Sequence, residues 1–159
     1  MKRVLISVLI FSLLLLCAGC GSPDENSCTF YYLRTADTIR YGADNPLIAP
    51  ITLEISDESP QLNYLLQLYL DGPTKKDYYN PIPKGTYLLS TLWDEDVLVL
   101  VLSREFSTLE NMHLTLAGAC LTATCHALTG AEKIQVRSAD TVFDFDLNNY
   151  VFTDTSTGD

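Results

Sequence analysis

The sequence predicts an α+β fold, with one small mixed or antiparallel sheet and two helices packed on one face of it. Strand-like and helix-like segments follow one another in the order β, β, α, β, β, α, β, β. The strand-like segments are short and the helices sit among them, which favours this class. The chain has 159 residues, 47% of them hydrophobic, which fits one domain with its own core and excludes a disordered chain.

The first part of the domain is predicted to be extended. Residues 29–33 are aromatic and β-prone, and a second short extended piece covers 38–41. Pro46 and Pro50 indicate a loop, after which residues 51–55 alternate between apolar and polar side chains as a strand does.

The first helix is predicted to begin at Ser59-Pro60, an N-cap followed by the first helical residue. Its apolar positions fall at helical spacing and form one stripe: Leu62, Leu65, Leu66 and Tyr69. Gly72-Pro73 ends the helix, because glycine accepts a left-handed conformation and proline cannot continue the helix.

A loop over 77–84 leads to two apolar strands, 86–93 and 97–102. The acidic residues 94–96 join these strands in a tight hairpin turn. Two further short strands, 134–136 and 142–145, follow later in the chain.

The second helix is predicted to start at a capping box over 107–110 and to end at Gly130. One face carries apolar and small residues: Leu114, Ala117, Gly118, Leu121, Cys125 and Leu128. The small residues Ala117 and Gly118 let the helix approach a sheet closely.

The N-terminus is predicted to be a lipoprotein signal peptide. Lys2 and Arg3 precede an apolar run over 4–16, which as a helix is about 20 Å long and too short to span a bilayer. Ala18-Gly19-Cys20 resembles a bacterial lipobox, although its first position holds Cys17 where leucine is usual. An ordinary secreted protein cleaved after a small residue is the alternative.

These features divide the chain into a signal peptide (1–19), a lipidated Cys20 with a short tether (20–27), a folded domain (28–152) and a polar tail (153–159). Cleavage leaves 8 basic and 20 acidic residues, a formal charge of −12. An acidic surface excludes nucleic acid as a partner and gains nothing from anionic lipids. Acyl chains on Cys20 are therefore expected to hold the domain at the outer face of the cell membrane.

Three cysteines remain in the mature domain, so at most one internal disulfide can form. Cys120 and Cys125 are too far apart along one helix to bridge each other. A bridge from Cys28 to either of them and three free thiols are both open, with free thiols favoured.

Catalytic and metal-binding patterns are weak throughout, and no cofactor or metal is expected. His113 and His126 point about 140° apart on the second helix and cannot share a metal. Asp144 and Asp146 alternate with phenylalanines, which is typical of a strand with one solvated face. Cys125 and His126 point about 100° apart, and no serine lies in a nucleophile elbow.

Nine tyrosines are many for this length, and the pair Tyr78-Tyr79 lies in the predicted loop. Exposed tyrosines are common in contacts with proteins and sugars. Tyr78 and Tyr79 are therefore the candidate partner contact.

Five segments in a fixed order resemble the GerMN domain, the sporulation and spore-germination module of Gram-positive lipoproteins. They are Phe30-Tyr31-Tyr32, the helix end 68–74 with Gly-Pro, the Pro-x-Gly-Thr segment 82–86, and the segments 127–130 and 132–136. The likeness covers about 28–146.

The resemblance implies a non-enzymatic envelope module whose α-β-β-α-β core is similar to the ring-building motif of envelope assemblies. Such modules oligomerise or dock onto protein partners, which is the first functional hypothesis. A lipoprotein that binds peptidoglycan fragments or another small ligand is the alternative, and an enzyme comes third. The short single copy differs from family members that carry long linkers or tandem domains.

Overall fold

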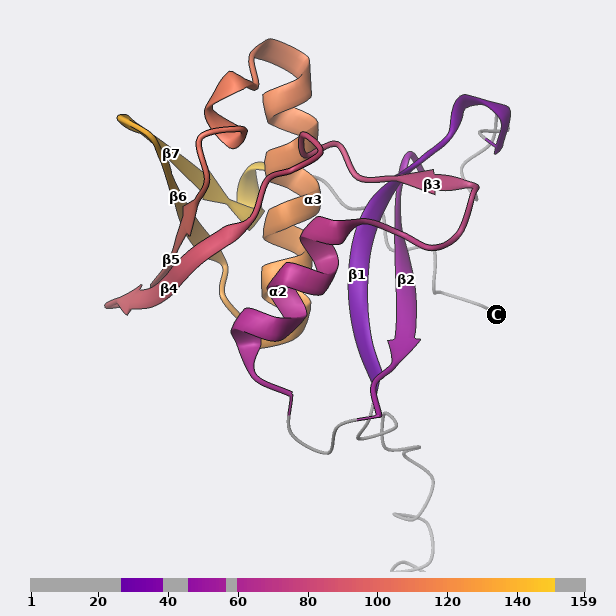
Figure 1. The fold of residues 1–159 in the computed structure, drawn as a ribbon, viewed down its shortest axis with the longest axis horizontal. Coiled ribbons are helices and arrows are strands. Elements are labelled where there is room, and N and C mark those ends of the chain that lie inside the picture. Colours follow the sequence, from indigo (N-terminus) through magenta and orange to yellow (C-terminus); the bar gives the residue numbers. More distant parts are fainter. Residues whose placement is uncertain (1–26, 39–45, 57–59, 151–159) are drawn as a thin grey trace, which may run out of the picture.

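Helix α3 forms the middle layer of the domain, with a sheet on either side of it (Figure 1). The computed structural model describes residues 27–38, 46–56 and 60–150. Within them the strands are β1 Ser27–Arg34, β2 Ile48–Glu54, β3 Tyr78–Tyr79, β4 Leu88–Asp94, β5 Val97–Leu102, β6 Lys133–Ser138 and β7 Thr141–Asp146. The helices are α2 Leu62–Asp71 and α3 Asn111–Thr129, with short 3-10 helices η1 Ala36–Thr38, η2 Phe106–Thr108 and η3 Leu147–Asn149.

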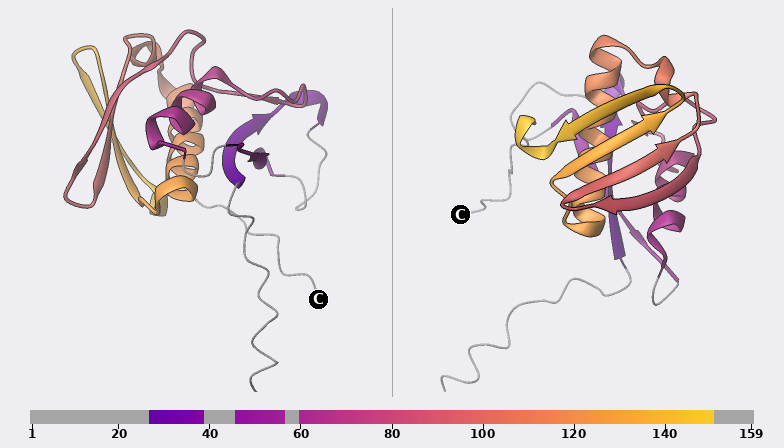
Figure 2. Two further views of the ribbon diagram at one scale, coloured as in Figure 1. Left: turned by 60° about the horizontal axis from the view of Figure 1, so that its bottom comes forward. Right: turned by 90° about the vertical axis from the view of Figure 1, so that its left-hand side faces the viewer.

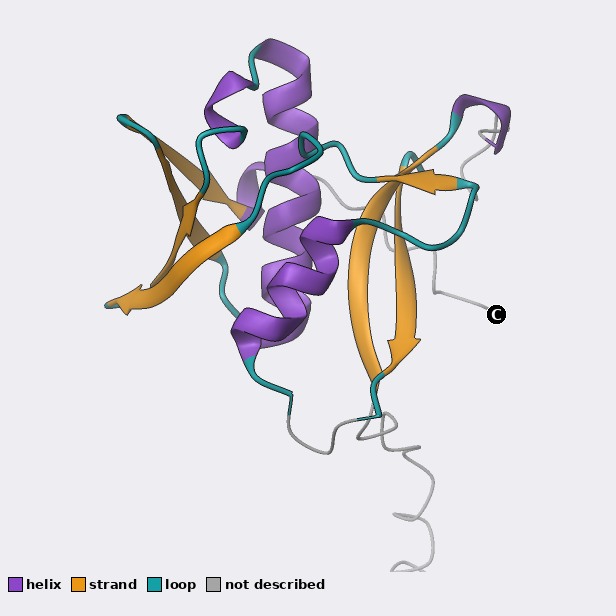
Figure 3. Cartoon of the chain, viewed as in Figure 1, coloured by secondary structure: helices purple, strands orange, loops and turns teal. Residues whose placement is uncertain are grey.

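The α+β class is confirmed, but the strands divide between two sheets where the sequence predicted one (Figure 3). One sheet has the order β2-β1-β3, and the other has the order β4-β5-β6-β7. The reason lies in α3, because all nine residues from Ala117 to Cys125 are buried. A helix buried all round needs cover on more than one face. The single apolar face predicted for it is therefore only part of its buried surface.

The predicted α-β-β-α-β core is formed by α2, β4, β5, α3 and β6. The two-residue β3, which lies between α2 and β4 in the chain, belongs to the three-stranded sheet. β4 and β5 form an antiparallel hairpin in which Asp94 lies opposite Val97, which confirms the predicted turn. β6 lies parallel to β5 after the crossover through α3, and β7 returns antiparallel. Both helices lie on one side of the four-stranded sheet, and Figure 2 shows its other face uncovered.

The core lies between the sheets and the helices. β5 contributes Leu98, Leu100 and Leu102, and the other sheet contributes Phe30 and Tyr32, all of them at most 1% exposed. Rings also stack across the layers, since the Tyr32 and Tyr69 centroids lie 5.1 Å apart.

Both predicted helix starts are wrong. Pro60 precedes α2, which begins after Gln61 without a side-chain cap, while Ser59 lies outside the described residues. Ser107 and Thr108 of the predicted capping box belong to η2, and α3 begins after Glu110. Ser107 lies inside η2, ahead of the N-cap Glu110, and its hydroxyl donates to the carbonyl oxygen of Arg104 in its own turn. A serine or threonine hydroxyl that bonds backward in this way competes with a cap.

The predicted helix ends are confirmed. Gly72 follows α2 with a φ of +95°, and Gly130 follows α3 in the left-handed conformation with a φ of +78°. Glycine adopts such angles without steric cost.

Smaller differences concern the loops. The tyrosine loop contains the short strand β3, which pairs with β1. Pro50 lies in β2, where it is tolerated because β2 is an edge strand. Thr38 belongs to η1 and is not extended; the rest of the predicted piece 39–41 lies outside the described residues.

The predicted signal peptide 1–19, Cys20 with most of the tether, and the tail 153–159 also lie outside the described residues. Among the helices that the structure does describe, none is both long and apolar enough to span a bilayer.

Candidate functional site

The predicted contact residues Tyr78 and Tyr79 lie on the wall of a groove of about 830 Å³. The groove runs between the C-terminal end of α2 and the segment that leads into β4. Its lining residues are Gln67, Leu70, Asp71, Gly72, Pro73, Tyr78, Tyr79, Asn80, Ile82, Lys84, Gly85, Thr86 and Tyr87. We call this feature the tyrosine groove.

One buried carbonyl oxygen connects the elements that form the tyrosine groove. The backbone oxygen of Tyr69 accepts hydrogen bonds from the Tyr32 hydroxyl (3.1 Å), the Asn80 amide (2.9 Å) and the Gly72 N–H (3.1 Å). The Asn80 side-chain oxygen in turn accepts from the Ile82 N–H (3.1 Å). Asn80 thereby joins the end of α2 to the segment that contains Ile82. A side-chain amide that satisfies backbone groups in this way stabilises the loop.

The two predicted tyrosines differ in their surroundings. Tyr78 is half-buried and lies opposite Arg34 in the β1–β3 ladder, with the guanidinium carbon 5.5 Å from the ring centre. Tyr79 is 46% exposed. Alternation along β3 explains the difference, because successive side chains of a strand point to opposite faces. Tyr79 is therefore the more exposed ring of the pair, while Tyr78 both lines the groove and contacts Arg34.

Sequence reasoning did not single out two other groove residues. The Tyr87 side chain is 52% exposed, and Thr86 is buried with a hydroxyl that has no hydrogen-bond partner. A buried unpaired hydroxyl is unfavourable unless something binds it. The one sequence signal for Thr86 is its place at the end of the Pro-x-Gly-Thr segment.

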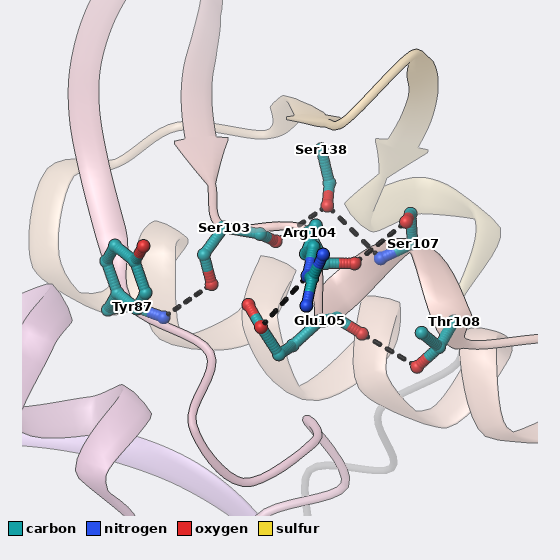
Figure 4. Close-up of polar contacts among 7 residues, drawn as sticks. All are labelled: Tyr87, Ser103, Arg104, Glu105, Ser107, Thr108 and Ser138. Carbon is teal, nitrogen blue, oxygen red and sulfur yellow. Dashed lines mark hydrogen bonds and ion pairs between the residues drawn. The ribbon is translucent and has the colours of Figure 1, made fainter.

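A buried serine network holds the rim that carries Tyr87 (Figure 4). The Tyr87 N–H donates to the Ser103 hydroxyl oxygen (3.1 Å), and the Ser103 N–H donates to the Tyr87 carbonyl oxygen (3.0 Å). The Ser138 hydroxyl donates to the Ser103 carbonyl oxygen (2.7 Å) and accepts from the Ser107 N–H (3.1 Å). Ser103 and Ser138 are at most 4% exposed, so this rim is anchored in the core.

The groove combines aromatic and charged side chains. Two exposed aromatic rings lie among an acid, Asp71, and a cation, Lys84. Such a mixture offers stacking surface and a few oriented polar groups.

The other candidate residues do not join this groove. His113 and His126 are exposed on α3, and His126 contacts the carbonyl oxygen of Ala131 at 3.2 Å. Asp144 accepts from the side-chain amide of Gln135 (2.8 Å) on the outer sheet face, as expected for a solvated position. Across the described ranges, no three His, Cys, Asp or Glu residues are grouped so that they could hold a metal ion.

The three described cysteines are free thiols, so the open alternative of a disulfide from Cys28 is not realised in this structure. Cys120 and Cys125 are fully buried, and burial raises the pKa of each thiol to about 12. A thiol with so high a pKa is a poor nucleophile at neutral pH.

Comparison with known proteins identifies a family and a fold. The model of the Germane family, described as sporulation and spore germination, matches residues 29–141. No curated protein matches the sequence. The tandem GerMN domains of the sporulation protein GerM from Bacillus subtilis align with a TM-score of 0.56 and 15% identity, covering 77% of this chain.

This chain spans 43% of that tandem-domain chain. The first GerMN domain of the same protein aligns with a TM-score of 0.55 and 14% identity, over 74% of this chain and 85% of that one. At these identities the likeness concerns the fold.

Proposed function

This chain belongs to the Germane family of sporulation and spore germination, and we propose that it is a lipid-anchored envelope module that docks onto a protein partner through the tyrosine groove. The proposal joins three elements: the family, the predicted anchor and the groove. Each has its own support, and each can be tested separately.

The observation that carries the proposal is the position of the two segments that best mark the resemblance. The Gly-Pro end of α2, within 68–74, forms one side of the groove, and the Pro-x-Gly-Thr segment, within 82–86, forms the other. Residues of both segments are thus used to build one concave surface. Asn80 and the Ser103 network brace that surface with hydrogen bonds, and a braced surface loses less entropy on binding.

The exposed groups of the groove favour a protein partner. Tyrosine is enriched among the residues that contribute most to protein interfaces, because its ring is large and rigid and its hydroxyl can find a polar partner. Tyr79 and Tyr87 offer two such rings, 46% and 52% exposed.

The anchor places this surface at the membrane. The lipobox-like segment at Cys20 supports diacyl attachment, and two chains suffice for stable anchoring. The formal charge of −12 in the mature chain makes electrostatic attachment to anionic lipid unfavourable. We therefore propose the extracytoplasmic face of the cell membrane as the location.

A lipoprotein that binds peptidoglycan fragments is the second candidate. The volume of the groove, about 830 Å³, lies in the range of small-molecule sites. Aromatic rings next to Asp71 and Asn80 also suit a sugar, which stacks its apolar face and hydrogen-bonds its hydroxyls. Both candidate functions are binding functions that need no catalytic group. The buried thiols of Cys120 and Cys125 are poor nucleophiles, which agrees with a binding function.

The test is cross-linking in living cells of the native host, followed by purification of the tagged chain and mass spectrometry. The variant carries Tyr79→Ala and Tyr87→Ala together. Tyr64→Ala is the matched control, because Tyr64 is 56% exposed on α2 but does not line the groove. We expect a stoichiometric protein partner that the double variant loses and the control retains.

Two results would contradict docking through the groove. One is equal capture by the double variant and the control. The other is the recovery of wall fragments without any protein, which would favour the second candidate.

A further inference from the structure

The sheet edges of the described domain are not equally protected against pairing with another strand. β2 carries the exposed Pro50, which cannot donate to an added strand. β3 has only two residues, and β7 carries Asp144 and Asp146. Short edges, prolines and charges are the devices by which soluble proteins prevent edge-to-edge pairing. The fourth edge, β4, has no lysine, arginine or proline.

β4 is instead apolar and exposed. Its only charged residue is Asp94, the last of the strand. Leu89, Leu92 and Trp93 are 57%, 43% and 51% exposed. A long apolar edge of this kind is a template for another strand.

The second half of β4 is the accessible part. Helix α2 contacts the strand at two places: the Leu88 N–H donates to the Gln67 side-chain oxygen (3.0 Å), and the Thr91 hydroxyl donates to the Asn63 side-chain oxygen (2.6 Å). Only the first of these bonds uses a backbone group of β4. The turn end of the β4–β5 hairpin reaches beyond both helices (Figure 1). Any added strand is therefore expected to centre near Leu92.

The ladder determines which backbone groups are available there. A two-residue turn joins β4 to β5, so the flanking pair Asp94 and Val97 is hydrogen-bonded. Pairs in an antiparallel ladder alternate between hydrogen-bonded and non-hydrogen-bonded. Thr91 and Trp93 consequently direct their N–H and C=O groups away from β5, toward the open edge.

We propose that β4 pairs in an antiparallel manner with β4 of a second copy, with Leu92 opposite Leu92. In this register Thr91 of each copy exchanges both backbone hydrogen bonds with Trp93 of the other. The two Leu92 side chains meet in a non-hydrogen-bonded pair, where side chains lie closest. Ser90 then faces Asp94 of the other copy, so a hydroxyl meets each carboxylate and no like charges are opposed.

A second copy fits this edge because, about the two-fold axis, the apolar Leu92 meets itself and each Asp94 meets Ser90 and not another acid. The interface is small, so the dimer is weak for free chains and strengthens when both copies share one membrane. It does not use Tyr79 or Tyr87, so it stands apart from the groove. The result is one continuous sheet of eight strands, twice the four of each copy.

The test is oxidative cross-linking of the full-length chain with Leu92→Cys in host membranes. A non-hydrogen-bonded antiparallel pair brings α-carbons to about 4.5 Å, within the range that a disulfide spans. Val142→Cys is the matched control, since Val142 is 54% exposed on the other edge strand, β7. We expect a species of doubled mass with Leu92→Cys and not with Val142→Cys or the unaltered chain.

Adding Trp93→Pro to Leu92→Cys removes an N–H of the open edge and leaves the β5 ladder intact, so the doubled species should be lost. Adding Tyr79→Ala and Tyr87→Ala should leave it unchanged, which separates this proposal from the groove. Equal dimer at position 142, no dimer at position 92, or a cross-link from position 92 to a different protein would overturn the proposal.

Discussion

Substitution of Gly118 by alanine is expected to destabilise the domain, although it adds a better helix former. Gly118 lies in the middle of α3, where alanine is favoured by about 1 kcal/mol. A β-carbon at this position would overlap the ring of Phe145 and lie 2.9 Å from the Tyr150 hydroxyl oxygen. The helix approaches β7 so closely that only glycine fits, as the small-residue pattern predicted.

The ring has little room to move. Phe145 is 9% exposed and stacks on Phe143, with ring centroids 6.4 Å apart and planes at 14°. Overpacking of a filled core costs about 1–3 kcal/mol. With the propensity gain of about 1 kcal/mol subtracted from this cost, we expect Gly118→Ala to lower the free energy of unfolding by up to about 2 kcal/mol.

The assay is urea unfolding, followed by circular dichroism. Ala127→Gly, at an exposed position of α3, measures the propensity effect alone and should lose about 1 kcal/mol. Phe145→Leu combined with Gly118→Ala should recover part of the overlap cost, giving a favourable coupling in the double-mutant cycle. An increase in stability on Gly118→Ala would refute the close approach of α3 to β7.

Three further predictions concern the groove, the thiols and the anchor. Asn80→Ala removes the bonds to the Tyr69 oxygen and the Ile82 N–H, and urea unfolding should show a loss of about 1–2 kcal/mol; an unchanged midpoint would mean that Asn80 does not hold the groove. Burial raises the pKa of Cys120 and Cys125 from 9.0 to about 12. The stability that the two buried neutral thiols contribute is therefore complete below pH 9 and is lost as the pH rises toward 12, because the unfolded chain loses these protons first. At pH 10 each thiol should lower the free energy of unfolding by about 1 kcal/mol relative to pH 8, and the double alanine variant should show a smaller decrease. Cys20→Ser should move the protein from the membrane to the soluble fraction on an immunoblot, and continued membrane association would place the anchor elsewhere.

Local patterns predicted most elements because their causes are local. The aromatic run of β1, the hairpin turn after Asp94 and the glycine at the end of α3 depend on residues that are neighbours in sequence. The helix starts were predicted incorrectly because serine and proline are common both in the first turn of a helix and in the turn before it. Pro60 precedes α2, and Ser107 lies in η2. The Ser107 hydroxyl bonds backward to Arg104 where a cap would bond forward.

The division into two sheets could not be read from strand patterns. It depends on the middle of α3, residues 117–125, being buried on every side, and the polar residues Thr122 and Thr124 concealed this. Each satisfies its hydroxyl locally or across the layer, since Thr122 donates to the Gly118 oxygen (2.7 Å) and Thr124 accepts from the Tyr31 N–H (2.9 Å). A pattern of apolar and polar residues predicts such a threonine to be exposed, because it does not show the hydrogen bonds that allow its burial.

The groove was predictable only in part. Tyr78 and Tyr79 were identified by their type and their place in a loop, and the structure puts both on the groove wall. Tyr87 and Thr86 join them through long-range contacts, above all the bonds between Tyr87 and Ser103. Such contacts depend on how β4 and β5 meet the end of α2, which no local pattern encodes.

The most direct measurement for the central claim is site-specific photo-cross-linking in sporulating or germinating cells of the host. A photoreactive phenylalanine analogue replaces Tyr79 in one strain and Tyr64 in another, both on the full-length chain. If the tyrosine groove is the docking surface, position 79 should capture one protein partner in good yield and position 64 should not. Capture from both positions alike, or from position 64 only, would contradict it.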